Sequence, residues 1–140
     1  MDIIKNILNP VTDEEMEKLK RTSKVSARIV ANKGMHSEPA AHIAIEDFYI
    51  GPPTDRVGFW HDEIHIILKG KAEVTSQGFP TFEKQVVTVE KGDCCIIHRG
   101  EQVNWSTIEE PVRKICIVMP RQEISAASIY GPQVGQAKTQ

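Results

Sequence analysis

The sequence predicts a single all-β domain with a short helical segment at its N-terminus. The chain has 140 residues, which is the length of one ordinary domain. From Lys24 onward it consists of short β-branched runs broken by Gly, Pro and Asn, a texture typical of an antiparallel sandwich or barrel. We expect strands at Val25–Ala31, Ala41–Ile50, His61–Leu68, Lys71–Thr75, Gln85–Val89, Cys94–His98, Gln102–Ser106 and Val112–Met119.

Residues 1–23 form the expected helical segment. Apolar residues recur there at helical spacing before Asn9-Pro10 ends the run, namely Ile3, Ile4, Ile7 and Leu8. Thr12 followed by Glu15 is a capping-box pattern, and basic residues follow where a helix dipole favours cations. These features predict a helix over Asp13–Arg21.

The β domain is expected over residues 24–120, followed by a polar tail over 121–140 that is mobile or packed on a partner. Turn chemistry separates the strands: Lys69-Gly70 and Ser76-Gln77-Gly78 suit tight connections, and Glu90–Asp93 is a turn.

Composition excludes several classes of partner. The formal net charge is −2, the pI is near 6.2 and the 17 Lys and Arg are spread along the chain, so we expect no nucleic-acid partner. The chain shows neither a signal peptide nor an apolar run of membrane-spanning length, which predicts a cytoplasmic protein without a membrane partner. Cys94, Cys95 and Cys116 stand in apolar surroundings and are interpreted as reduced core thiols.

Two stretches resemble the motifs of the cupin superfamily. Glu63-Ile64-His65-Ile66-Ile67-Leu68-Lys69-Gly70 resembles the end of the first cupin motif, and Lys91-Gly92-Asp93-Cys94-Cys95-Ile96-Ile97-His98-Arg99-Gly100 resembles the start of the second. Trp105 followed by Arg113-Lys114 is similar to the subgroup that contains ureidoglycine aminohydrolase-like and ethanolamine-utilisation cupins. The resemblance covers about residues 40–119 and implies a single-domain jelly-roll barrel in which Glu63 points inward. It does not define the function, because cupins include enzymes of many classes and plain binding modules.

The departures from the cupin pattern concern its metal ligands. Typical metallocupins carry His-x-His a few residues before the motif's Glu, whereas this chain reads Asp55-Arg56-Val57-Gly58-Phe59-Trp60. In the second motif Val103 stands where the final His would fall, and His98 replaces the Pro. Of the ordinary metal set only Glu63 remains by position. We therefore favour a site without a metal cofactor, while a divalent metal held by Glu63, His61, His65 and His42 stays an alternative.

Strand geometry favours acid–base chemistry at Glu63. Side chains two residues apart on a strand lie about 6.6 Å from each other on one face, so either His61 or His65 can be the proton partner of Glu63. His61 and His65 are about 13 Å apart by the same rise, which is too far for both to bind one metal ion without a severe bend. A buried carboxylate with a raised pKa and an imidazole partner can move a proton between two substrate atoms. The expected catalytic residues are therefore Glu63, His61 and His65, and the expected substrate-binding residues are Trp60, Phe59, Arg56, His98, Trp105 and Tyr49.

The same alternation has a plainer interpretation. Ile64, Ile66 and Leu68 form an apolar face, so periodicity alone would bury them and leave the ionisable residues in water. The cupin resemblance reverses this orientation, in which case the N-terminal segment or a partner subunit must cover the Ile face; we expect a homodimer. Three functions remain open: a lyase-, isomerase- or cyclase-type enzyme acting on a small carbonyl or carboxylate metabolite, a non-catalytic ligand-binding or assembly cupin, and a metal-dependent hydrolase or dioxygenase.

Overall fold

The computed structural model describes residues 3, 5–8, 11–20, 25–33, 41–57, 61–78 and 81–119, with backbone alone for 25–33, 41–42 and 54–57. The elements are α1 (Asp13–Lys18), β1 (Val25–Lys33), β2 (Ala41–Phe48), β3 (Thr54–Val57), β4 (Glu63–Gln77), β5 (Gln85–Glu90), β6 (Cys94–Ile97) and β7 (Gln102–Val118). The expectation for the tail at 121–140 lies outside the described residues.

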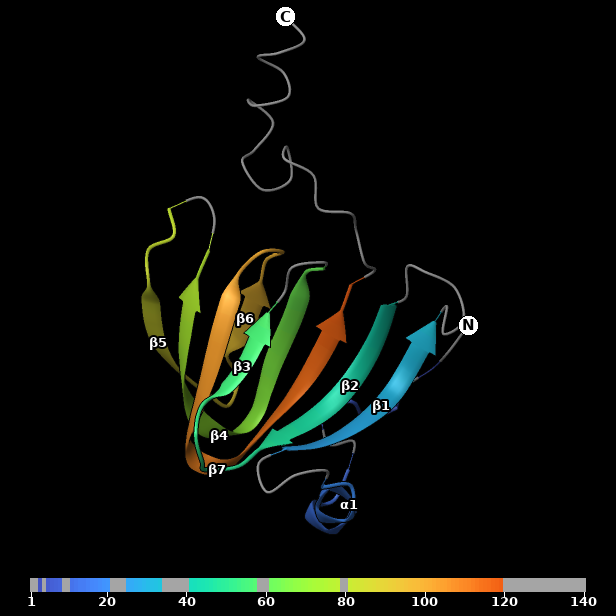
Figure 1. Ribbon diagram of the computed structural model, residues 1–140. Helices are drawn as coiled ribbons and strands as arrows, with labels where there is room; N and C mark the ends of the chain where they lie inside the picture. The colour runs from blue at the N-terminus through green and yellow to red at the C-terminus, as the bar shows by residue number, and fades with distance from the viewer. Residues whose placement is uncertain are drawn as a thin grey trace, which may run out of the picture.

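Every strand pairing is antiparallel, and two long strands organise the sheet. The order is β1-β2-β7-β4-β5, with β3 also paired to β7 and β6 also paired to β4. The first part of β4 and the last part of β7 run with β1, β2 and β6, whereas their other parts run with β3 and β5. Figure 1 shows β4 and β7 curving as they pass from one group of strands to the other. The predicted all-β fold is confirmed.

Two expected turns lie within these long strands. His61–Leu68 and Lys71–Thr75 join into β4, and Gln102–Ser106 and Val112–Met119 join into β7. The register between the two strands shifts three times between Ile67 and Ala72, so Lys69-Gly70 is a bulged bend in place of a hairpin. A Cβ at Gly70 would lie 2.3 Å from the Pro111 carbonyl oxygen, which is why the bend needs a glycine.

The N-terminal helix is shorter than predicted. Thr12 and Glu15 form the predicted capping box, but α1 ends at Lys18, with Leu19 as its C-cap. Residues 6–8 form a bend and turn, so the helical spacing of the first apolar residues does not produce a helix in the part of that segment that is described. The short strand β3 was not expected.

Apolar side chains form two clusters on opposite faces of the sheet. The inner cluster contains Phe48, Ile67, Ala72, Val74, Val89, Ile97, Val103, Trp105 and Val112. In the outer cluster Val11 and Met16 of the N-terminal segment pack with Ile45 and Ile115, and the partly buried residues against them include Ile66 and Leu68. The N-terminal segment therefore helps to cover the Ile face of β4, which leaves the Glu63 face pointing inward.

Candidate functional site

The candidate site begins at the start of β4, where Glu63 lies between two histidines. Glu63 is 5% exposed and His65 is completely buried. The Nε2 atom of His61 lies 2.9 Å from Glu63 Oε1, and Nε2 of His65 lies 2.7 Å from Glu63 Oε2. The His61 side chain retains 26% of its exposure, so it is the solvent-facing member of the group. The solvated-face interpretation of this strand is wrong, and both imidazoles reach the carboxylate.

Burial determines the protonation of His65. The pKa of His65 is lowered from 6.5 to about 4: burial is the largest cause, the positive charge of Lys114 acts in the same direction, and the hydrogen bond with Glu63 opposes both. His65 is therefore neutral at neutral pH. Since an ionised carboxylate only accepts hydrogen bonds, Nε2–H of His65 donates to Glu63 Oε2 and the lone pair lies on Nδ1. Within the part of the chain that the structure describes, that buried Nδ1 has no hydrogen-bond partner.

Strand β7 places a thiol and an ammonium beside this pair. Cys116 is the register partner of His65, and its Sγ lies 3.6 Å from His65 Nε2 and 3.9 Å from Glu63 Oε2. Lys114 is completely buried, with Nζ 3.7 Å from the centre of the Trp105 ring and 3.9 Å from that of Phe48. These cation–π contacts hold the ammonium inside the barrel.

Trp105 lies beside the site, but it is also a core residue. Its ring centre is 5.3 Å from that of His65, and it meets Phe48 edge-on at 6.0 Å. The residue is 1% exposed. It therefore forms an apolar wall against His65, in the place where a substrate wall was expected.

The other predicted site residues fall into two groups. The side chains of Arg56 and His42, and the whole of Phe59 and Trp60, lie outside the described residues. Tyr49 is placed outside the site, because its hydroxyl lies 3.4 Å from Glu17 and its ring lies under Lys20 beside α1.

Sequence reasoning missed the contributions of β7. Arg113 and Lys114 entered the sequence analysis only through the family resemblance, yet they are 6% and 0% exposed. Cys116 was interpreted as a plain core thiol. The signal was the alternation of Val112, Lys114, Cys116 and Val118, which places all four on one face of the last strand. Cys94, also expected in the core, is exposed.

His98 lies at a groove formed by residues of β4, β5, β6 and the start of β7. The groove has a volume of about 480 Å³, and His98 is an exposed residue of its lining. Cys95 and Ile97 also line it and are the register partners of His65 and Glu63 on β4. Its apolar lining includes members of the inner cluster, namely Val74, Val89, Ile97 and Val103. The groove therefore approaches the candidate site from the β6 side.

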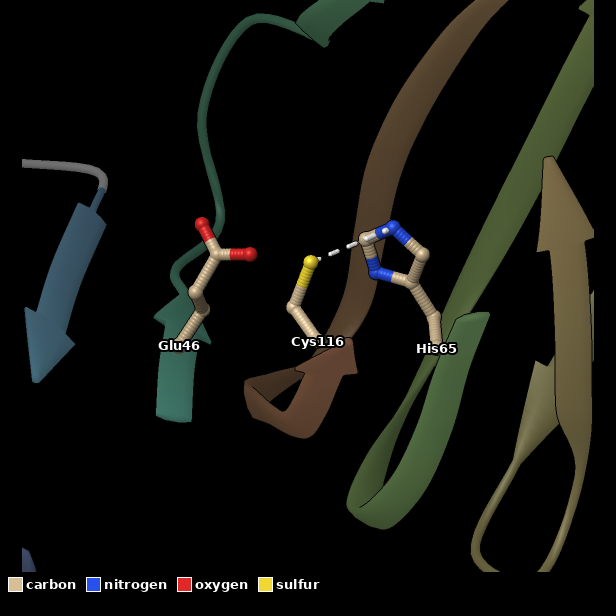
Figure 2. A group of neighbouring side chains, drawn as sticks. All are labelled: Glu46, His65 and Cys116. Atoms are coloured by element: carbon tan, nitrogen blue, oxygen red, sulfur yellow. Dashed lines mark hydrogen bonds between the residues drawn. The ribbon is translucent and has the colours of Figure 1, made fainter. Parts of the chain in front are cut away.

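Among the described residues, the group that could hold a metal shares only His65 with the predicted set, and the His42 side chain of that set lies outside them. Val103, at the position of the missing cupin His, is 1% exposed within the inner apolar cluster. One ligand atom each from Glu46, His65 and Cys116 lie within 4.8 Å of one another, and all three residues are buried. Figure 2 shows them side by side on β2, β7 and β4, with Cys116 in the middle. This set can provide three donors to an ion, and it is distinct from the usual cupin ligands.

Comparison with known proteins defines the fold. No protein-family model and no curated protein matches the chain. The structure is similar to a protein of unknown function from Rhizobium leguminosarum bv. viciae, with a TM-score of 0.61 and 19% identity over 86% of this chain and 99% of that one. It is also similar to a cupin-superfamily protein from Desulfitobacterium hafniense, with a TM-score of 0.55 and 16% identity over 81% and 86% of the two chains.

A third similar structure is a mutant of the oxalate decarboxylase of Bacillus subtilis. Its TM-score is 0.60 at 16% identity, over 76% of this chain and 28% of that one. The chain thus has the cupin jelly-roll fold, which its neighbours use both in an enzyme and in proteins whose names state no activity. Among the described residues, no helix has the length and apolar character needed to cross a membrane.

Proposed function

We propose that this protein is an acid–base enzyme that moves a proton on a small metabolite carrying a carbonyl or carboxylate group, with Glu63 as the catalytic residue. The observation that carries the proposal is the buried Glu63 carboxylate, with an imidazole nitrogen within 2.9 Å of each oxygen. We also propose, from the resemblance of Trp105 and Arg113-Lys114, that the chain is related to the ureidoglycine aminohydrolase-like and ethanolamine-utilisation cupins.

The two histidines differ in the way that a proton transfer requires. His65 is neutral and buried, so its Nε2–H orients one oxygen of Glu63 without supplying a proton to it at neutral pH. His61 is partly exposed and can exchange protons with water. Each carboxylate oxygen has a second lone pair, so Glu63 can still accept a proton from substrate.

The reaction step follows from this arrangement. Glu63 takes a proton from the carbon next to a carbonyl, and the electron pair of the broken C–H bond moves toward the carbonyl oxygen. His61 in its protonated form then returns a proton at another atom of the substrate. Elimination, enolisation and ring closure all share this first step. The Lys114 ammonium supplies a positive potential inside the barrel that favours an anionic intermediate.

A binding module is the second candidate, and the groove favours it. A volume of about 480 Å³ with a mixed lining, in which apolar residues such as Val74 stand beside polar ones such as Ser76 and His98, suits a small ligand. A protein that only binds such a ligand would need no proton transfer at Glu63.

Hydrogen exchange in D₂O tests the proposed proton transfer directly, whatever product the full reaction gives. The chain is incubated with a panel of 2-oxo and 3-oxo acids, and the loss of C–H signal is followed by proton NMR. We expect exchange on at least one acid, with a loss of at least ~100-fold in Glu63→Gln, the scale of a general base. The matched control is Glu73→Gln, because Glu73 is an exposed carboxylate on the same strand.

Two outcomes would overturn the enzyme proposal. Exchange that is unchanged in a folded Glu63→Gln variant removes Glu63 from the chemistry. Absence of exchange on every acid, together with a rise in melting temperature caused by one of them, identifies the binding module. Exchange that a chelator abolishes in the wild type would instead favour the metal-dependent alternative.

A further inference from the structure

Three buried donor side chains meet on the inner face of adjacent strands. Cys116 pairs in register with Ala44 of β2 on one side and with His65 of β4 on the other. Glu46 is two residues beyond Ala44, so its side chain projects from the same face of β2. Figure 2 shows the three side chains in a row, all directed to the same side of the sheet. The polar atoms converge although they come from segments far apart in the sequence.

The imidazole offers a lone pair to this cluster. Because Nε2–H of His65 donates to Glu63 Oε2 at 2.7 Å, the unprotonated nitrogen is Nδ1, which is buried without a hydrogen-bond partner among the described residues. Figure 2 shows the ring edge that carries both nitrogens turned toward Cys116. A buried acceptor that lacks a donor is costly unless another group satisfies it. A carboxylate on one imidazole nitrogen with a cation on the other is the usual arrangement of metal-bound histidines.

The kinds of donor atom select the ion. A thiolate, an imidazole and a carboxylate together suit zinc and similar thiophilic divalent ions, with ligand bonds of about 2.0 to 2.3 Å. Ligand atoms around such an ion lie about 3.5 Å apart. The three donors lie within 4.8 Å of one another, so the widest pair needs to close by roughly 1 Å. The rotatable Glu46 side chain allows that movement.

The surrounding charges also suit a divalent cation. Glu46 and Glu63 are buried carboxylates, and Cys116 becomes a third anion when it binds metal. Against these stand the Lys114 ammonium and the two charges of the ion. The charges of these buried residues therefore balance when the ion is bound.

We propose that Glu46, His65 and Cys116 form a site for a divalent zinc-class ion, with His65 binding through Nδ1. This site lies outside the positions at which typical metallocupins carry their ligands. The ion would link β2, β7 and β4 and hold His65 in the tautomer that donates to Glu63. The proposal does not depend on turnover, so it stands or falls separately from the proposed enzyme.

Cobalt binding tests the site directly, because a thiolate bound to Co²⁺ gives an intense near-ultraviolet charge-transfer band. The full chain, stripped of metal by a chelator, is titrated with Co²⁺ alone and then with Zn²⁺. We expect one Co²⁺ per chain, a thiolate band that Zn²⁺ abolishes, and a higher melting temperature with metal. Cys116→Ser should lose the band, whereas Cys94→Ser should retain it, since Cys94 is exposed.

Further variants keep the test decisive if Cys116→Ser does not fold. Glu46→Gln should weaken Co²⁺ binding at least 10-fold while keeping the thiolate band. Glu63→Gln alters only the partner of the ligating histidine and should weaken binding ~10- to 100-fold with the band intact. The proposal is overturned if wild-type protein gives no thiolate band. It is equally overturned if Cys95→Ser removes the band and folded Cys116→Ser keeps it, because the thiol would then belong to β6.

Discussion

The inner and outer faces of the same strand pair carry the same kinds of charge in different arrangements. Glu46 pairs in register with Lys114, and the next pair along the two strands is Asp47 with Arg113. On the outer face, Asp47 accepts two hydrogen bonds of 2.8 Å from Arg113. On the inner face, Lys114 lies over two aromatic rings, and the carboxylates lie near an imidazole and a thiol.

The Asp47–Arg113 pair on the outer face has a structural role, whereas the residues around His65 on the inner face are available for chemistry. The outer pair is bidentate and nearly saturated, and Arg113 also contacts Asp13 and the Val11 carbonyl, so it ties the N-terminal segment to the sheet. The inner charges surround a neutral histidine whose Nδ1 has no hydrogen-bond partner among the residues that the structure describes. Polar groups that form hydrogen bonds with each other stabilise the fold, whereas a lone pair such as that on Nδ1 of His65 can bind a ligand.

Breaking the outer pair should have the largest effect on stability. Asp47→Ala leaves a buried guanidinium without its main partner, and we expect a loss of about 3 kcal/mol in the free energy of unfolding, measured by urea denaturation. Replacing both residues, as Asp47→Leu with Arg113→Met, should recover most of it. A loss below about 1 kcal/mol for Asp47→Ala would show that Asp13 already supports Arg113, and that the two faces differ less than proposed.

Low pH should destabilise the metal-free protein, because His65 is buried in its neutral form on the inner face. The pKa of His65 is about 4 in the folded state and 6.5 in the unfolded chain, so as pH falls the unfolded state binds the proton first. Lowering the pH from 6.5 toward 4 should therefore reduce the free energy of unfolding by about 3 kcal/mol in total. Urea unfolding at several pH values measures this. His65→Gln should remove that slope, and His61→Gln should keep it; an equal slope in His65→Gln would assign the effect to other groups.

The sequence predicted the strands better than their connections. The β-branched runs and the Gly, Pro and Asn residues between them were sufficient for the all-β class, because strand and turn chemistry are local, whereas the jelly roll followed from the cupin resemblance. Whether Lys69-Gly70 closes a hairpin or forms a bulge depends on the register between β4 and β7, and the same residues suit both. The sequence therefore could not show that four expected strands join into two.

The same limit applies to the candidate site. Glu63 and His65 lie two residues apart on β4, and His61 lies two residues before Glu63, so their grouping follows from alternation. Glu46 and Lys114 meet only because β2 pairs with β7 in one particular register. A shift of β2 by one residue would instead place Asp47 opposite Lys114 on the inner face. Nothing in either segment alone distinguishes these registers.

Removing the inner ammonium should raise the pKa of His65. In Lys114→Met an apolar chain of similar volume replaces the buried cation, so the positive charge beside the imidazole is lost while the packed volume is kept. The pKa of His65 should rise above 4 but stay below 6.5, because burial lowers it more than Lys114 does. A pH titration of the histidine ring signals by NMR measures it. An unchanged pKa would mean that Lys114 does not act on the imidazole.

Removing the helix cap should have the smallest effect and be confined to the outer face. The Thr12 side chain accepts from the Glu15 backbone N–H at 3.2 Å, and Thr12→Ala should cost about 1 kcal/mol of unfolding free energy in urea. The helix places the completely buried Met16 in the outer cluster, so that loss loosens the cover of the Ile face. Thr12→Ser should restore stability. Glu14→Ala is the matched control, because Glu14 lies in the first turn of the helix but is not part of the capping box. Co²⁺ affinity should stay unchanged in Thr12→Ala; a weaker site would show that the packing of the outer face positions the inner donors.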